Sequence, residues 1–130
     1  MSERENKPNT SNWFMWFDVR HRDIGDWAFV LHRLTALGLV LYLGMHLIVL
    51  GTLTLGPDAF NSFIDLAHNP LFIFGELLVV AAALYHGLNG LRVGLTSFGV
   101  AIPYQKQLWY VVMAIAVIGS IIFAISMFTA

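Results

Sequence analysis

The stretch LFIFGELLVVAAALYHGLNGLRVGL, residues 71–95, decides what kind of fold this chain adopts. It is long enough to cross a ~30 Å hydrocarbon core as a helix, because a span needs about 20 mostly apolar residues. It nevertheless carries Glu76, His86 and Arg92. Ionisable side chains inside a membrane span are costly and usually functional. The stretch therefore predicts a transmembrane helix that holds part of a functional site.

Two further apolar runs lie on either side of it, at about residues 27–55 and 108–128. In lipid the backbone must satisfy its own hydrogen bonds, so apolar runs of this length predict helices. Composition agrees, since 58% of the 130 residues are hydrophobic, 12% are charged and the mean hydropathy is +0.70. The sequence predicts an all-α membrane protein with three transmembrane helices, in which residues 27–130 form the membrane domain and residues 1–26 a cytoplasmic or interfacial N-terminal segment.

The positive charges all lie on one side of this layout. Five precede or open the first run and two flank the connection between the second and third runs, namely Arg4, Lys7, Arg20, Arg22, Arg33, Arg92 and Lys106. The connection at residues 56–70 and the C-terminus carry none. The positive-inside rule then predicts a multi-pass protein of the cell's inner (cytoplasmic) membrane, with its N-terminus in the cytoplasm and its C-terminus outside.

Two histidines lie inside spans, at opposite depths. At 1.5 Å per residue, His46 is about 28 Å from the cytoplasmic end of its run and His86 about 24 Å from the outer end of its own. The axial nitrogens of one haem iron lie only about 4 Å apart. The two histidines therefore cannot share an iron. Each is either a haem ligand that needs a second ligand from a partner chain, or an imidazole bonded to a neighbouring helix.

The neighbours of His86 favour the haem alternative. Gly87 and Gly90 leave a surface without side chains, on which a flat ring can lie. Arg92 follows at the membrane boundary, where a guanidinium can bind haem propionates.

The chain has no cysteine, so thiolate ligation of zinc or of an iron–sulfur cluster is excluded within it.

Other polar residues in the spans extend this candidate site. His32 and Arg33 open the first run, where they suit a propionate, a quinone carbonyl or a lipid phosphate; snorkelling is the plain alternative for Arg33. Glu76 lies about 9 Å into the second run from the outer side, as a structural carboxyl or as a proton carrier. Tyr85 and Tyr104 fit the pattern of ordinary interfacial tyrosines.

These residues, taken together, resemble the cytochrome b membrane-anchor subunit of succinate dehydrogenase/fumarate reductase (complex II). The resemblance covers about residues 24–128 and is carried by LHRLT at residues 31–35, MHL at 45–47 and LYHGLNGLR at 84–92. The family pattern is an opening His-Arg-x-Ser/Thr-Gly and a later His-x-x-x-Gly-x-Arg. The chain departs from it at Ala36, where the family usually has glycine.

The resemblance implies that His86 ligates a haem b near the cytoplasmic side and that His46 ligates a second haem near the outer side. It implies that His32, Arg33, Arg92 and Gly90 surround the first haem and a quinone site. We expect Glu76 to lie near the second haem and to exchange protons with a menaquinone-type quinone.

The same resemblance implies a larger complex. Its partners would be a flavoprotein, an iron–sulfur protein and a second small membrane-anchor subunit that completes the helical bundle. The chain would then be a subunit of a succinate:quinone oxidoreductase that carries no active site for succinate, and nucleic acid is not expected as a partner. Two other classes fit the same sequence. One is a structural anchor without haem, and the other is a small transporter or proton-path subunit that uses Glu76 and the histidines.

Overall fold

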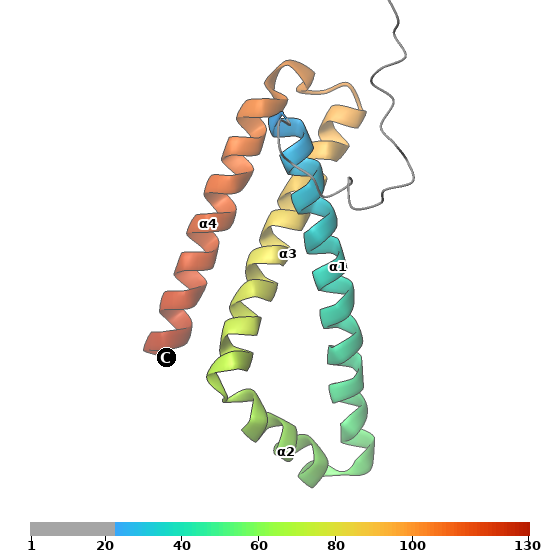
Figure 1. The fold of residues 1–130 in the computed structure, drawn as a ribbon, viewed down its shortest axis with the longest axis vertical. Helices are drawn as coiled ribbons and strands as arrows, with labels where there is room; N and C mark the ends of the chain where they lie inside the picture. Colours follow the sequence, from blue (N-terminus) through green and yellow to red (C-terminus); the bar gives the residue numbers. More distant parts are fainter. Residues whose placement is uncertain (1–22) are drawn as a thin grey trace, which may run out of the picture.

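A computed structural model describes residues 23–130 as a bundle of helices, with no strand in that range. Most of the expected N-terminal segment 1–26 lies outside the described residues. Three long helices run side by side (Figure 1): α1 (Ile24–Gly51), α3 (Pro70–Ser97) and α4 (Gln105–Thr129). The shorter elements are η2 (Thr52–Leu55), α2 (Pro57–Ala67) and η3 (Ile102–Tyr104).

Three segments of this bundle are long and apolar enough to cross a membrane, and they are Ile24–Leu55, Pro70–Ser97 and Ile102–Thr129. Each of them contains one of the apolar runs found in the sequence, extended at one or both ends. The expectation of an all-α membrane protein with three spanning helices is therefore confirmed.

The helix ends follow from local sequence. Gly56 closes the first span with φ +108°, a backbone conformation that glycine adopts without steric cost. The side chain of Asn69 caps α3 by accepting a hydrogen bond from the backbone N–H of Leu71 at 3.0 Å. Pro70 then occupies the first turn of α3, where its missing N–H costs nothing.

The connection between the first two spans contains a helix that the sequence analysis did not predict. In α2 the half-buried residues are Ala59, Phe60, Phe63 and Ala67, which recur at helical spacing on one face. The ring of Phe63 meets that of Phe72 on α3 edge to face, with centroids 5.9 Å apart. α2 thus lies across the end of the bundle opposite the start of α1 (Figure 1).

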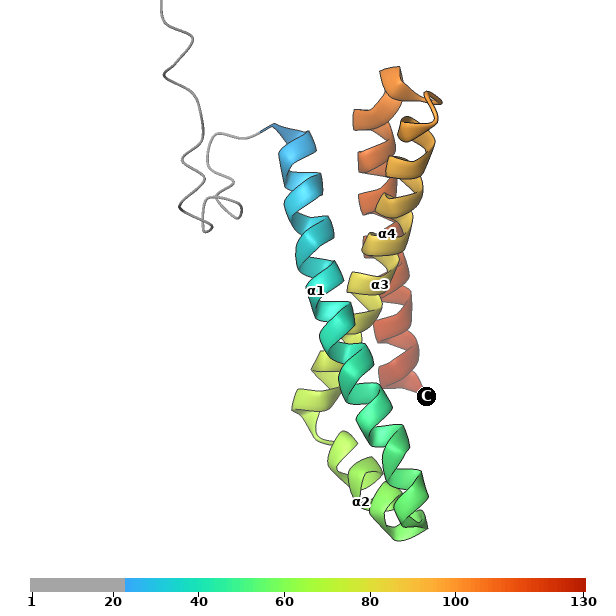
Figure 2. The same cartoon turned by 90° about the vertical axis from the view of Figure 1, so that its right-hand side faces the viewer.

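The bundle is best packed at the end where α1 begins. α3 packs against both α1 and α4, whereas α1 and α4 touch each other little, and the two views agree on this arrangement (Figures 1 and 2). The buried side chains lie in the first turns of α1, the later half of α3 and the first half of α4, and they are Ala28, Val30, Tyr85, Asn89, Val112 and Ala116. Gly119 lets α4 approach α3 closely, since a Cβ there would lie 2.9 Å from Leu84 Cδ1.

Candidate functional site

His86 on α3 is bound to α1 through one of its ring nitrogens. Nδ1 lies 3.1 Å from the carbonyl oxygen of His32 and 3.2 Å from the hydroxyl oxygen of Thr35. A carbonyl oxygen can only accept, so Nδ1 must carry the proton in this contact. In the neutral imidazole the lone pair is then on Nε2, and this nitrogen makes no hydrogen bond within residues 23–130.

The imidazole of His32 stacks on that of His86. The ring centroids are 4.0 Å apart and the ring planes differ by 7°. The lone pair of an imidazole nitrogen lies in the plane of its ring, and two parallel planes do not meet. A single iron therefore cannot take both rings as axial ligands in this arrangement, whereas the ring edge of His86 stays compatible with ligation.

The surface without side chains that we expected beside His86, at Gly87 and Gly90, is partly covered by the ring of His32. A Cβ built on Gly90 would lie 3.6 Å from Cε1 of His32, while one on Gly87 would meet nothing within 4 Å. The flat ring that Gly90 admits in this structure is thus the ring of His32. Nδ1 of His32 is buried and has no hydrogen-bond partner among the described residues. A buried polar atom left without a partner costs about 1–3 kcal/mol, so this nitrogen calls for a partner from outside residues 23–130.

Asn89 lies one turn after His86 and positions Arg92. The side chain of Asn89 is 1% exposed, and its Oδ1 accepts a hydrogen bond from Nε of Arg92 at 2.9 Å. Arg92 also donates from Nη1 to the carbonyl oxygen of Gln105 at 3.3 Å, which links α3 to the start of α4. Nδ2 of Asn89 is the second buried polar atom in residues 23–130 without a partner. Arg92 is therefore held at the end of the bundle where the histidine pair lies.

Tyr85 joins all three spanning helices and is buried between them. It is 6% exposed, and its hydroxyl donates to the carbonyl oxygen of Ala28 on α1 at 2.9 Å. The same oxygen accepts a hydrogen bond from the indole N–H of Trp109 on α4 at 3.3 Å. These two hydrogen bonds hold α1, α3 and α4 together at the end of the bundle that carries the histidine pair.

Arg33 is exposed on α1, next to His32 in the chain but on another side of the helix from the His86 contact. Its guanidinium lies over the ring of Phe29, 5.2 Å from the centroid. A cation on an aromatic face in this way is held without losing its charge. The start of α1, the end of α3 and the start of α4 lie at the same end of the bundle (Figure 1), and these segments carry Arg33, Arg92 and Lys106.

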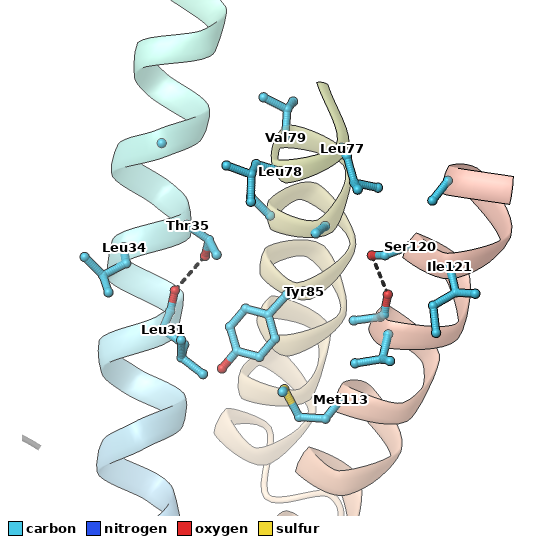
Figure 3. A pocket seen from close by; sticks show the side chains of 16 residues that line it. Leu31, Leu34, Thr35, Leu77, Leu78, Val79, Tyr85, Met113, Ser120 and Ile121 are labelled. Carbon is cyan, nitrogen blue, oxygen red and sulfur yellow. Dashed lines mark hydrogen bonds between the residues drawn. The ribbon is translucent and has the colours of Figure 1, made fainter. Parts of the chain in front are cut away.

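A groove of about 700 Å³ runs along the bundle between the three spanning helices and shares residues with the histidine site. Figure 3 shows Thr35 of α1, Tyr85 of α3, and Met113 and Ser120 of α4 among its lining residues. The hydroxyl groups in the groove are bonded to backbone carbonyl oxygens. Thr35 and Ser120 each donate within their own helix, and Tyr85 donates across to α1. The groove therefore offers an apolar wall that begins at the level of the His32–His86 pair.

His46 lies far from this cluster. It is fourteen residues beyond His32 in the same unbroken helix, a rise of about 21 Å. The depth separation expected from the sequence is therefore present in the structure. His46 is exposed, and its one hydrogen-bond contact within residues 23–130 is Nδ1 to the hydroxyl of Tyr42 at 3.4 Å, one turn back on α1. Glu76 is exposed on α3, and no hydrogen bond or ion pair joins it to His46.

No three histidine, aspartate or glutamate side chains within residues 23–130 lie close enough to hold a bare metal ion. The sequence analysis singled out His86, His32, Gly90 and Arg92, which the structure brings to one helix end. It missed Thr35 and Asn89, although each lies three residues from a selected histidine and so on the same helix face.

One family model and two relatives that match this chain agree in kind. The family model for the succinate dehydrogenase/fumarate reductase transmembrane subunit matches residues 3–123. The succinate dehydrogenase 2 membrane subunit SdhC of Mycobacterium tuberculosis is 31% identical over 91 residues, which cover 69% of this chain and 67% of the relative. The succinate dehydrogenase hydrophobic membrane anchor subunit of Halobacterium salinarum is 30% identical over 125 residues, 93% of this chain and 94% of the relative.

The family match covers the first two spans and most of the third, and it includes both His46 and His86. The second relative is aligned along almost its full length, so the likeness is one of whole chains and not of a shared motif. Together with three helices able to cross a membrane, this establishes a multi-pass membrane protein. The chain belongs to the succinate dehydrogenase/fumarate reductase transmembrane subunit family.

Proposed function

We propose that this chain is the cytochrome b membrane-anchor subunit of a succinate:quinone oxidoreductase. In this role it binds haem b through His86 and helps to form the site where a quinone receives electrons from an iron–sulfur partner. The observation that carries the proposal is the bonding of His86. Its Nδ1 donates to the backbone of α1, which leaves Nε2 as the nitrogen with the free lone pair.

The residues around His86 fit a haem. Ligating histidines commonly donate their other ring N–H to a carbonyl oxygen, as His86 does here. Because the ring of His32 is stacked on His86 and cannot converge on the same iron, the second axial ligand would come from a partner chain. When bound, the haem would supply a one-electron store beside the quinone. The protein would hold its propionates with the guanidinium of Arg92, which Asn89 orients.

His32 and Arg33 would serve the quinone or propionate side of this site. The unpartnered Nδ1 of His32 needs a hydrogen-bond partner, and a quinone carbonyl, a propionate oxygen or a water could each supply it. Arg33 brings a permanent charge to the same level of α1. The apolar groove that begins at Thr35 and Tyr85 provides hydrocarbon-like surface next to His86, which Thr35 contacts.

The outer half of the bundle would hold a second haem at His46. In support, Tyr42 and His46 form a polar pair on an exposed face of a spanning helix, where burial against a partner chain would remove them from lipid. The partner would also supply the other axial ligand. Glu76 would exchange protons at this level with a menaquinone-type quinone.

The complex would comprise a flavoprotein, an iron–sulfur protein and a second small anchor subunit, and succinate chemistry would belong to the flavoprotein. Arg33, Arg92 and Lys106 lie at one end of the bundle. The positive-inside rule assigns this end to the cytoplasmic side of the cell's inner membrane and the C-terminus to the outside. The soluble partners would then dock at the end that holds the His32–His86 pair.

The test is haem per flavin in the purified complex that carries His86→Ala. We expect the haem component near the cytoplasmic side to be lost, because Nε2 of His86 is its proposed ligand. Succinate oxidation with an artificial dye should persist, since it needs no membrane haem. An unchanged ratio and an unchanged reduced-minus-oxidised spectrum would defeat the proposal.

One observation also favours a second function, that of a haem-free structural anchor. The bond from His86 to the backbone of α1 joins two spanning helices and would stabilise the bundle without any haem. The two functions differ in one measurement on the wild-type complex. A structural anchor would show flavin but no haem absorbance.

A further inference from the structure

The proton on Nδ1 of His86 has two acceptors of different origin. The carbonyl oxygen of His32 at 3.1 Å belongs to the backbone and is present whatever residue occupies position 32. The hydroxyl oxygen of Thr35 at 3.2 Å depends on one side chain. The two distances are nearly equal, so the N–H is shared between them. One of the two contacts that hold the His86 ring therefore depends on a single side chain that can be substituted.

The hydroxyl of Thr35 is itself held in place. Its one proton is directed at its own helix, where the carbonyl oxygens of Leu31 and His32 lie at 2.8 and 2.9 Å. Figure 3 shows the bond to Leu31 and the side chain turned toward the space between the helices. A threonine in a helix has few χ1 choices, and this back-bonded one is fixed by the bond. With the proton committed to α1, the oxygen faces Nδ1 of His86 as an acceptor.

We propose that Thr35 is a positioning residue that sets the redox potential of the iron held by His86. This inference rests on the proposed haem function. An acceptor on the distal N–H fixes the tautomer and the ring orientation and makes the ligating nitrogen a stronger donor. A stronger donor favours ferric over ferrous iron and so lowers the midpoint potential. Removing the hydroxyl of Thr35 should therefore raise the potential of this haem component.

The experiment compares three variants in the intact complex. Thr35→Val keeps the branched shape and removes the hydroxyl, and Thr35→Ser keeps the hydroxyl and removes the methyl group. Thr52→Val is the matched control, because Thr52 is also half-buried and donates to a backbone carbonyl oxygen one turn back, that of Val49 at the end of α1. It lies seventeen residues further along the first span, a rise of about 26 Å. The readouts are redox titration of the His86 haem component, the low-spin ferric spectrum and haem per flavin.

We expect Thr35→Val to raise the midpoint potential and to alter the ferric spectrum, Thr35→Ser to restore both, and Thr52→Val to match wild type. If Thr35→Val proves unable to hold haem, the serine variant decides. Wild-type haem content and potential in Thr35→Ser support the inference, and an equal loss in both variants overturns it. A wild-type potential in Thr35→Val also overturns it. These failures differ from failure of the proposed function, which would show as a wild-type complex without haem or as haem retained in His86→Ala.

Discussion

The two histidine regions of this chain are built in different ways. His86 lies where α3 packs on α1, with its N–H bound to α1 and its face covered by His32. His46 lies on an exposed part of α1, and its one hydrogen-bond contact within residues 23–130 is with Tyr42 of its own helix. The first histidine is oriented by residues of two helices of this chain. The second makes no hydrogen bond to α3 or α4 that would orient it.

The difference indicates what each level needs from other chains. At His86 the tautomer and the ring plane are fixed before any partner arrives, so a partner needs to supply only the second ligand. At His46 an exposed polar pair in a span gains most from burial against another helix. We therefore expect haem binding at His86 to tolerate substitutions in the partner chain better than haem binding at His46 does.

The largest effect is expected when His46 is removed. His46→Leu should abolish one of two haem components in a redox titration and leave the His86 component at its wild-type potential. The two levels are separated by about 21 Å of helix, so loss at one should not disturb the other. Loss of the His46 component should be complete, because His46 is the ligand that this chain is proposed to supply to it.

The matched control for this test is Tyr42→Phe. It removes a hydroxyl contact of 3.4 Å and leaves the imidazole in place, so the outer haem component should persist. A single haem component that His46→Leu does not change would end the case for a second haem. Glu76 would then lose its proposed proton role as well.

A smaller effect is expected at Arg33. Arg33→Lys keeps the charge but loses the planar fork that binds a carboxylate or carbonyl through two N–H groups. Charge-assisted hydrogen bonds are worth roughly 1.5–3 kcal/mol, so succinate–quinone activity should fall about tenfold or more. Dye-linked succinate oxidation should stay at the wild-type rate. Lys106→Arg is the control, as a cation exchange at the same end of the bundle, and should leave both assays unchanged. Equal quinone activity in Arg33→Lys and wild type would remove Arg33 from the quinone site.

Much of the architecture could be predicted because membrane spans obey simple rules. Length and apolarity predict the three helices, and the structure ends the first span at Gly56 and begins α3 after the Asn69 cap. α2 was missed because its connection was treated as loop, although Phe60, Phe63 and Ala67 already showed a helical spacing. The bilayer thus constrains the long helices far more tightly than the segments outside it.

The inner contacts of the site could not be read from the sequence. The spans are apolar on every side, so their pattern does not show which face of α1 meets α3. That rotation is decided by packing, as where Tyr85 reaches the carbonyl oxygen of Ala28 and where Gly119 admits Leu84. The sequence shows that Gly90 leaves space beside His86, but it does not show that the ring of His32 occupies this space. The contact of Thr35 with His86 depends on this rotation, because it crosses from α1 to α3. Asn89 does not depend on it, since it bonds to Arg92 on its own helix at a spacing that the sequence already shows.

The smallest effect tests whether the stacked pair supports the inner level. A Cβ at Gly90 would lie 3.6 Å from Cε1 of His32, an ordinary contact, so Gly90→Ala should leave the complex close to wild type. Gly90→Leu extends beyond that contact and should push the ring of His32 from its place on His86. Overpacking of this kind costs about 1–3 kcal/mol, which should lower the thermal midpoint of the complex by a few degrees.

Gly94→Leu is the control, because Gly94 lies on the same helix and a Cβ there would meet nothing within 4 Å. If Gly90→Leu melts with wild type and keeps its haem spectrum, the stacking of His32 on His86 contributes nothing to the stability of the inner site. Only the hydrogen bonds of Nδ1 would then distinguish the two histidine levels.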